Sequence, residues 1–206
     1  MNLLTIAPVI PVVVLDDPEH AVPMAQALLD GGIGVLELTL RTPIALRAIE
    51  LIATRVPEMT VGAGTVLTPR QATDAASAGA RFLVSPGSTT TLVDAMTDTG
   101  LPILPGVATA SEILTLLERG LTHMKFFPAR SNGGAAALRA LSGPLPQVRF
   151  CPTGGIDATT ALDYLALPTV DCVGGSWLTP AVLLRNRDWP RIRELAAAAS
   201  ALTSAQ

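Results

Sequence analysis

One pattern repeats along the 206 residues of this chain: a short apolar run, a turn, and a helical stretch of about a dozen residues. The apolar runs predict strands at residues 9–15, 35–40, 59–66, 82–85, 102–107, 123–127, 148–153 and 171–175. Helices are expected between them at residues 18–30, 43–55, 69–78, 89–99, 109–119, 133–141 and 157–166, with a last helical region at 177–201. Strands that alternate with helices favour a parallel sheet.

The number of repeated units indicates how that sheet closes. Eight strand–helix units with right-handed crossovers are typical of a (β/α)8 TIM barrel, and the chain is near the lower size limit of that fold. We therefore expect a single α/β barrel domain over residues 1–206. A doubly wound open sheet is the main alternative, but no G-x-G-x-x-G motif follows the first predicted strand.

Helix boundaries are marked by residue types with distinct backbone preferences. Proline fits the first helical turn, and glycine commonly ends a helix. The expected starts are Pro43 and Pro69, which follow Thr42 and Thr68, and Asp157; the expected ends are Gly31, Gly79, Gly100 and Gly120.

Charge and cysteine content argue against a nucleic-acid-binding protein and against a disulfide-bonded protein. The formal net charge is -3 and the arginines are scattered, so no basic stripe predicts a nucleic-acid partner. Cys151 and Cys172 lie in apolar strand-like runs and predict buried free thiols of a cytoplasmic protein. The apolar start, residues 1–15, lacks a basic segment and is too short to span a bilayer, so we expect a first strand and not a signal sequence.

Lys125 is the only lysine in the chain, although Lys and Arg together number 14. It lies in an apolar run with Met124, Phe126, Phe127 and Pro128. Partial desolvation there favours a neutral amine that can attack a carbonyl group, which an arginine cannot do. The simpler alternative is a lysine at a strand end whose neighbours bury only its stem. The absence of any other lysine favours the nucleophile.

The second predicted strand divides into two faces. Leu36, Leu38 and Leu40 should pack against the helices, while Glu37 and Arg41 should enter the mouth of the barrel. In barrels of this type, catalytic groups gather at the carboxyl ends of the strands. An ion pair between Glu37 and Arg41 with a purely structural role is the alternative.

Other strand ends add polar and glycine-rich segments. Thr65 lies at the end of the third strand, Pro86 follows the fourth, and glycine-rich segments at 153–157 and 174–176 lie at the ends of the last two. Such late loops are where barrels commonly bind phosphate through backbone N–H groups. The two histidines, His20 and His123, have no metal-binding spacing, so we expect no metal site, with His20 on a helix surface and His123 inside or at a strand start.

The chain resembles the 2-keto-3-deoxy-6-phosphogluconate (KDPG) aldolases, which are class I pyruvate aldolases, over residues 11–180. The resemblance rests on six stretches: residues 35–42 (VLELTLRT), 61–67 (VGAGTVL), 84–87 (VSPG), 125–129 (KFFPA), 151–156 (CPTGGI) and 174–178 (GGSWL). One departure is acidic: Asp16 and Asp17 end the first strand, where relatives often have a basic residue near the phosphate.

The resemblance implies a role for each matching residue. Lys125 would form the imine and Glu37 would act as general acid and base. Arg41, Thr65, Pro86 and Phe127 would surround pyruvate, Thr153 would influence stereochemistry, and Gly154, Gly155 and Ser176 would bind phosphate. The resemblance further implies a cytoplasmic homotrimer that needs no cofactor.

Two other functions stay open. The first is the same chemistry on unphosphorylated 4-hydroxy-2-oxoglutarate (KHG). The second is a phosphosugar-binding barrel or isomerase without lyase activity, which would form no imine with pyruvate.

Overall fold

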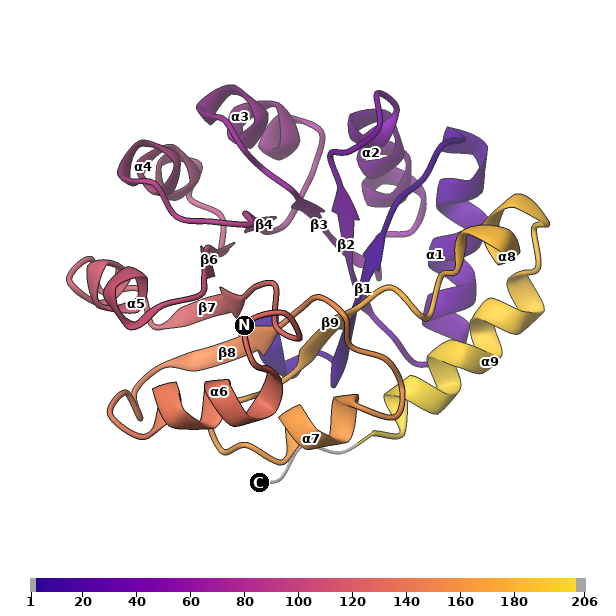
Figure 1. Ribbon diagram of the computed structural model, residues 1–206. Coiled ribbons are helices and arrows are strands. Elements are labelled where there is room, and N and C mark those ends of the chain that lie inside the picture. Colours follow the sequence, from indigo (N-terminus) through magenta and orange to yellow (C-terminus); the bar gives the residue numbers. More distant parts are fainter. Residues whose placement is uncertain (1–2, 203–206) are drawn as a thin grey trace.

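The computed structural model describes residues 3–202 and shows a ring of parallel strands surrounded by helices (Figure 1). The strands are β1 (Val9–Val13), β2 (Val35–Thr39), β3 (Thr60–Gly64), β4 (Leu83–Val84), β5 (Ile103–Leu104), β6 (Gly106–Val107), β7 (His123–Phe126), β8 (Arg149–Pro152) and β9 (Val173–Gly175). The helices are α1 (Ala21–Asp30), α2 (Ala45–Arg55), α3 (Pro69–Ser77), α4 (Thr90–Asp98), α5 (Ala110–Leu117), α6 (Gly134–Ser142), α7 (Ala161–Leu165), α8 (Ala181–Arg185) and α9 (Trp189–Ser200). Two 3-10 turns, η1 (Leu3–Thr5) and η2 (Pro18–His20), precede β1 and α1.

Strand pairing closes the ring. Six strands pair in the order β5-β4-β3-β2-β1-β9, and three pair in the order β6-β7-β8. Isolated parallel bridges, Phe150 with Val170 and Thr153 with Gly174, join the β8 and β9 segments. All the pairs are parallel and neighbours follow the chain order, which is the topology of the predicted (β/α)8 barrel and not of a doubly wound sheet.

The fifth strand is predicted as one continuous run over residues 102–107, but the structure divides it. It forms two short strands, β5 and β6, separated by Pro105. Proline has no N–H to donate to a neighbouring strand. The Pro105 carbonyl still accepts a hydrogen bond from the Lys125 N–H at 2.9 Å, so the segment remains one position in the ring.

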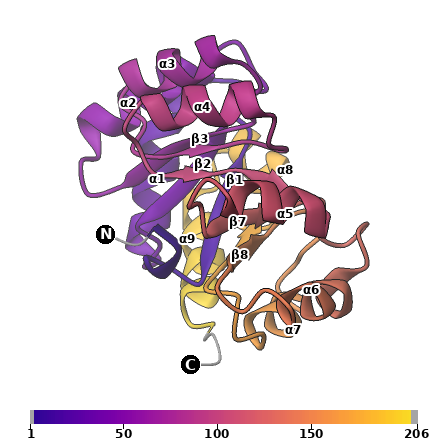
Figure 2. The ribbon, with the colours of Figure 1, turned by 90° about the vertical axis from the view of Figure 1, so that its left-hand side faces the viewer.

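The main core lies between the strands and the outer helices. Leu36 and Leu38 are fully buried there, as predicted, and Leu40 is partly buried against the same core. Figure 2 shows the helices stacked around the strands, with α2, α3 and α4 on one side and α6 and α7 on the other. The barrel fixes the strand ends and so positions the side chains that follow them.

Two predicted helix starts differ in outcome. Thr68 caps α3 through a capping box with Gln71, and Pro69 is the first helical residue, as expected. Helix α2 begins two residues later than predicted, at Ala45, and not at Pro43. The Thr42 hydroxyl does not cap it, because it donates to the Leu15 carbonyl at 2.6 Å and ties the end of β2 to the first strand.

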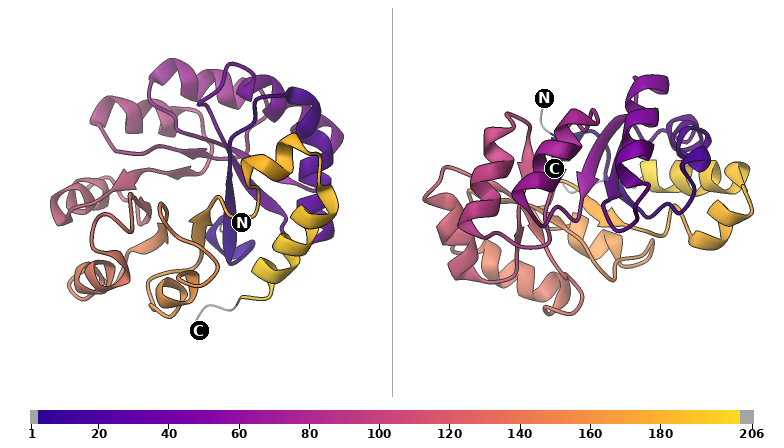
Figure 3. Two further views of the ribbon diagram at one scale, coloured as in Figure 1. Left: turned by 45° about the vertical axis from the view of Figure 1, so that its right-hand side comes forward. Right: turned by 90° about the horizontal axis from the view of Figure 1, so that it is seen from above.

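The C-terminal third contains shorter helices than the sequence predicts. Asp157 does not start a helix over 157–166: its carboxylate binds Thr159 and Thr160 in a turn, and α7 begins at Ala161. The region 177–201 divides into α8 and α9, which follow one another around the barrel (Figure 3). The break contains Arg187, whose φ of 54° is incompatible with a continuous helix.

His20 is buried, which corrects the prediction of a surface histidine. Its Nε2 accepts a hydrogen bond from Arg187 Nε at 3.2 Å, and its ring packs edge-on against Trp189 with 5.6 Å between centroids. These partners follow it by more than 160 residues, so local helix periodicity could not indicate the burial.

Candidate active site

The centre of the site is an ion pair across the barrel interior. Lys125 Nζ donates to the two carboxylate oxygens of Glu37 at 3.1 and 3.3 Å. The two side chains are 6% and 4% exposed. Because β7 and β2 are not neighbours in the ring, this contact requires both side chains to point inward, as the strand phase predicts for Glu37. The Lys125 amine is therefore buried, unlike that of a lysine that buries only its stem.

Glycine makes room for this pair. A Cβ on Gly64 of β3 would overlap the Glu37 carboxylate, so the side chain can cross β3 only where that residue has no side chain. On β6, a Cβ on Gly106, the register partner of Lys125, would overlap the backbone of Pro86, so this glycine lets the loop after β4 pack beside the lysine strand. Gly64 thus allows the Glu37 carboxylate of β2 to reach the Lys125 amine of β7.

Arg41 and Thr65 form a second polar contact at the mouth. Arg41 lies beyond the end of β2, is exposed, and donates from Nε to Thr65 Oγ1 at 3.3 Å. Thr65 has φ 58°, which is rare for a β-branched residue and costs about 1–3 kcal/mol. Such backbone strain is typical of functional sites. Arg41 does not pair with Glu37, so the purely structural Glu37–Arg41 ion pair considered from the sequence does not form.

A cavity of about 260 Å³ opens at the carboxyl ends of the strands. Six predicted site residues line it: Arg41, Phe127, Thr153, Gly154, Gly155 and Ser176. Four others lie outside its lining: Lys125, Glu37, Thr65 and Pro86. The Lys125 amine lies 5.3 Å from the centroid of the Phe127 ring, which joins the buried pair to the cavity.

The lining also includes residues that the sequence analysis did not single out. Val12 and Val14 of the first-strand segment and Ile156 contribute apolar surface. Val12 is the register partner of Glu37, so it occupies an inward position beside the carboxylate. Alternation along the first strand was the signal that could have identified Val12 and Val14.

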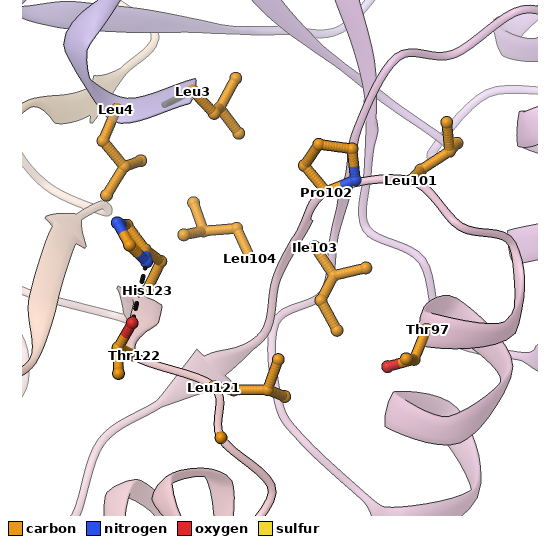
Figure 4. Close-up of a pocket in the computed structure, with 11 residues that line it drawn as sticks. Leu3, Leu4, Thr97, Leu101, Pro102, Ile103, Leu104, Leu121, Thr122 and His123 are labelled. Carbon is orange, nitrogen blue, oxygen red and sulfur yellow. Dashed lines mark hydrogen bonds between the residues drawn. The ribbon is translucent and has the colours of Figure 1, made fainter. Parts of the chain in front are cut away.

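A larger cavity, whose lining residues Figure 4 shows, lies at the amino ends of the strands. Its volume is about 540 Å³, and it lies between Leu3 and Leu4 and the amino ends of β5 and β7. His123, the first residue of β7 as expected, contacts Thr122 there at 3.1 Å. Among the residues that the structure describes, none with an amine or carboxylate side chain lines this cavity. Its size alone therefore does not make it the reactive site.

Other candidate groups for chemistry are few. A hydrogen bond to Cys151 and burial raise the pKa of the Cys172 thiol, which disfavours a thiolate nucleophile near neutral pH. Within residues 3–202, no cluster of three His, Cys, Asp or Glu side chains could hold a metal ion. In the same part of the chain, no helix is long and apolar enough to cross a membrane.

The structure thus combines a (β/α)8 barrel, a buried lysine beside a carboxylate, and a cavity at the strand ends next to that pair. This combination is typical of barrel enzymes that bind carbonyl substrates as imines. The family model for KDPG and KHG aldolases matches residues 1–195. The chain belongs to that family.

Relatives of known name agree with this assignment. The KHG/KDPG aldolase of Escherichia coli K12 is 53% identical over 195 residues, which cover 95% of this chain and 92% of the relative. The 2-dehydro-3-deoxy-phosphogluconate aldolase of Zymomonas mobilis is 46% identical over 99% of this chain and 96% of its own.

Solved structures agree as well. The Legionella pneumophila KDPG aldolase, captured with pyruvate as a covalent carbinolamine intermediate, superposes with a TM-score of 0.94 at 49% identity and covers 96% of each chain. A Zymomonas mobilis KDPG aldolase structure with 3-phosphoglycerate superposes with a TM-score of 0.93 at 47% identity, over 98% of this chain and 95% of that one.

Proposed function

We propose that this protein is a class I aldolase that cleaves KDPG to pyruvate and glyceraldehyde 3-phosphate through an imine on Lys125. The observation that carries the proposal is the buried contact between the Lys125 amine and the Glu37 carboxylate. The names of relatives at 46–53% identity support the substrate. The Legionella pneumophila carbinolamine supports the covalent route.

The ion pair provides the first proton transfer. As the substrate approaches, Glu37 takes a proton from Lys125, and the neutral amine adds to the C2 carbonyl carbon. Glu37 returns that proton to the hydroxyl of the carbinolamine, which leaves as water and gives a protonated imine, and Glu37 is again a carboxylate. This cation accepts the electron pair when a carbon–carbon bond breaks, so no metal ion is needed as the Lewis acid.

Glu37 then acts as the base for cleavage. Through one water molecule it removes the proton of the C4 hydroxyl, the C3–C4 bond breaks, and its electrons form an enamine. Glyceraldehyde 3-phosphate leaves with a new carbonyl group at the former C4. Glu37 returns a proton to the enamine carbon, and hydrolysis releases pyruvate and the free amine.

Arg41 and Thr65 orient the substrate carboxylate. The Arg41 guanidinium can bind a carboxylate in a bidentate manner, and its contact with Thr65 limits its freedom. Phe127 and Pro86 complete this end of the pocket. A fixed carboxylate presents the C2 carbonyl to Lys125 in one orientation.

Gly154, Gly155 and Ser176 bind the phosphate. Gly154 and Gly155 have consecutive positive φ values of 103° and 73°, which residues with a side chain rarely adopt. This backbone conformation can direct N–H groups toward a bound anion. All three line the cavity. The five-residue helices that follow these loops, α7 and α8, are too short to explain phosphate binding by themselves.

KHG cleavage is a second activity of the same site. The Escherichia coli relative is named for both substrates, and the chemistry at Lys125 and Glu37 is identical for both. A phosphosugar-binding barrel or isomerase without lyase activity would need neither the buried amine nor its carboxylate partner.

Turnover on the two substrates tests the proposed function. We expect cleavage of both KDPG and KHG, with pyruvate formation followed by a coupled assay, and a higher kcat/KM for KDPG. Addition of a chelator should leave both rates unchanged, since the imine replaces a Lewis acid. Cleavage of neither substrate would exclude aldolase activity, and loss of activity that a divalent ion restores would exclude the class I mechanism.

Thr153 gives a prediction about stereochemistry. It is 5% exposed, lines the cavity, and donates its hydroxyl to the Cys151 carbonyl at 3.3 Å. In Thr153→Val we expect discrimination between C4 epimers to fall by about 5-fold, the size of one lost hydrogen bond, with a smaller loss of total aldol activity. Chiral product analysis gives the epimer ratio.

Thr179→Val is the matched control, because Thr179 is equally buried, lies outside the cavity lining, and has a hydroxyl without a hydrogen-bond partner in the described structure. An epimer ratio that is the same in Thr153→Val and wild type would show that the Thr153 hydroxyl does not contact the substrate hydroxyl.

We also propose that the protein is a cytoplasmic homotrimer. Two buried free thiols support a reducing compartment. Large exposed apolar side chains, such as Leu67 and Leu114, support an interface between subunits. Sedimentation equilibrium should give three times the chain mass of 21.3 kDa, and a concentration-independent monomer would contradict the trimer.

A further inference from the structure

The proposed phosphate end of the cavity is poor in positive charge. Among the described residues that line the cavity, Arg41 alone is cationic, and its contact with Thr65 places it at the carboxylate end. One acidic residue close to this end adds negative charge. Asp157 follows Gly155 by two residues, and hydrogen bonds from Thr159 and Thr160 hold its pKa well below the usual range. A phosphate monoester carries about -1.5 to -2 charges at neutral pH, so backbone N–H groups alone leave this end undercompensated.

Arg130 lies directly beside the phosphate loop. It belongs to the turn after β7, and its N–H donates to the Gly154 carbonyl at 3.0 Å. Its side chain runs along the next residue: a Cβ built on Gly155 would lie 2.7 Å from Arg130 Cβ and 3.0 Å from Arg130 Cδ. The absence of a side chain at Gly155, together with its φ of 73°, is what allows this close approach.

The Arg130 guanidinium is available to a ligand. The residue is exposed, and within residues 3–202 no carboxylate forms an ion pair with it. Its positive charge does affect Tyr164: burial raises the pKa of that phenol, and the charge of Arg130 opposes the rise. A guanidinium without an ion-pair partner, beside a loop of backbone N–H donors, can donate bidentate hydrogen bonds to two phosphate oxygens.

We propose that Arg130 supplies the side-chain positive charge for the substrate phosphate and thereby sets the preference for phosphorylated over unphosphorylated 2-keto acids. This inference rests on the proposed phosphate-binding role of Gly154, Gly155 and Ser176. The aliphatic stem of Arg130 already lies along the Gly154–Gly155 loop, so only the guanidinium end of the side chain must turn to reach an anion there. An unphosphorylated substrate such as KHG ends at its C5 carboxylate, short of the position that the KDPG phosphate occupies, and gains less from Arg130.

Substitution of Arg130 tests the proposal. The variants are Arg130→Gln, Arg130→Lys, and Arg139→Gln as a control that removes one exposed positive charge from α6, outside the cavity lining. Each is assayed with KDPG, with KHG, and with inorganic phosphate as a competitive inhibitor, at two ionic strengths.

For Arg130→Gln we expect kcat/KM on KDPG to fall about 10-fold, mostly through KM, because a charge-assisted contact is lost at an exposed position. Inhibition by phosphate should weaken by a similar factor, and the salt dependence of KM should become shallower. Turnover of KHG should change by less than about 2-fold, because its C5 carboxylate stops short of the phosphate position and interacts only weakly with the lost charge. Arg130→Lys should be intermediate, and Arg139→Gln should match wild type.

Two outcomes would overturn the role of Arg130. Equal losses on KDPG and KHG would indicate that Arg130 only supports the loop. Unchanged KDPG kinetics in Arg130→Gln would show that its charge does not reach the phosphate. A wild-type enzyme with no preference for KDPG and no inhibition by phosphate would be a different failure, because it would overturn the phosphate site itself and the Arg130 role with it.

Discussion

Incubation with pyruvate and borohydride is expected to inactivate the enzyme irreversibly and to leave one reduced adduct per chain on Lys125. The amine is buried beside Glu37, which can take its proton, and the resulting imine is the species that borohydride reduces. Because the chain has no other lysine, peptide mapping by mass spectrometry should find the adduct in the peptide that contains Met124, Lys125 and Phe126.

Lys125→Arg keeps the positive charge and removes the nucleophile. We expect its cleavage activity to fall by at least about 10⁴-fold, because the covalent route is lost entirely. Circular dichroism and thermal unfolding would establish that the variant is folded.

Arg139→Lys is the matched control for labelling, since it adds a second lysine at an exposed position on α6. The adduct should stay on Lys125 in that variant. An adduct at residue 139 with equal efficiency, or at the amino terminus alone, would contradict the proposed mechanism.

The barrel was predictable because its signal repeats. Each strand–helix unit is recognised from a short local pattern. A chain of eight such units commonly folds into one topology, the closed (β/α)8 barrel. The errors occur where a contact distant in sequence competes with local preference. The Thr42 hydroxyl bonds to Leu15 and leaves α2 to begin later, and His20 is buried by Arg187 and Trp189. Pro105 is a different case, because a missing N–H divides a strand without changing its place in the ring.

For the candidate site, the sequence predicts the placement of single residues but not which of them pair. The isolation of Lys125 among arginines and the strand phase of Glu37 each indicate an inward, reactive position. Neither feature indicates that the Glu37 carboxylate forms its ion pair with Lys125 instead of Arg41. The choice of partner depends on which strands face each other across the barrel. Arg130 has no signal at all in the sequence, since its place beside Gly155 follows from how the turn after β7 packs on the loop after β8.

Glu37→Gln is expected to separate imine formation from proton transfer. Glutamine keeps the size and most of the hydrogen-bonding capacity of the side chain but cannot carry the proton. Proton transfer by a positioned group is typically worth about 10²–10⁴-fold, and we expect both KDPG cleavage and exchange of the pyruvate methyl protons with solvent to fall by about that factor. Reductive trapping with pyruvate should remain measurable, because it depends chiefly on the amine of Lys125. Proton NMR in deuterated water gives the exchange rate.

Asp157→Asn is the control for this experiment. It removes a carboxylate near the same end of the barrel, but that carboxylate binds Thr159 and Thr160 in a turn and does not contact Lys125. Methyl-proton exchange should therefore be unchanged in Asp157→Asn. If exchange also continues at the wild-type rate in Glu37→Gln, another group or a water molecule moves the proton. The buried carboxylate would then serve only to hold Lys125 in place, and the ion pair would be a structural contact beside a nucleophile that works without it.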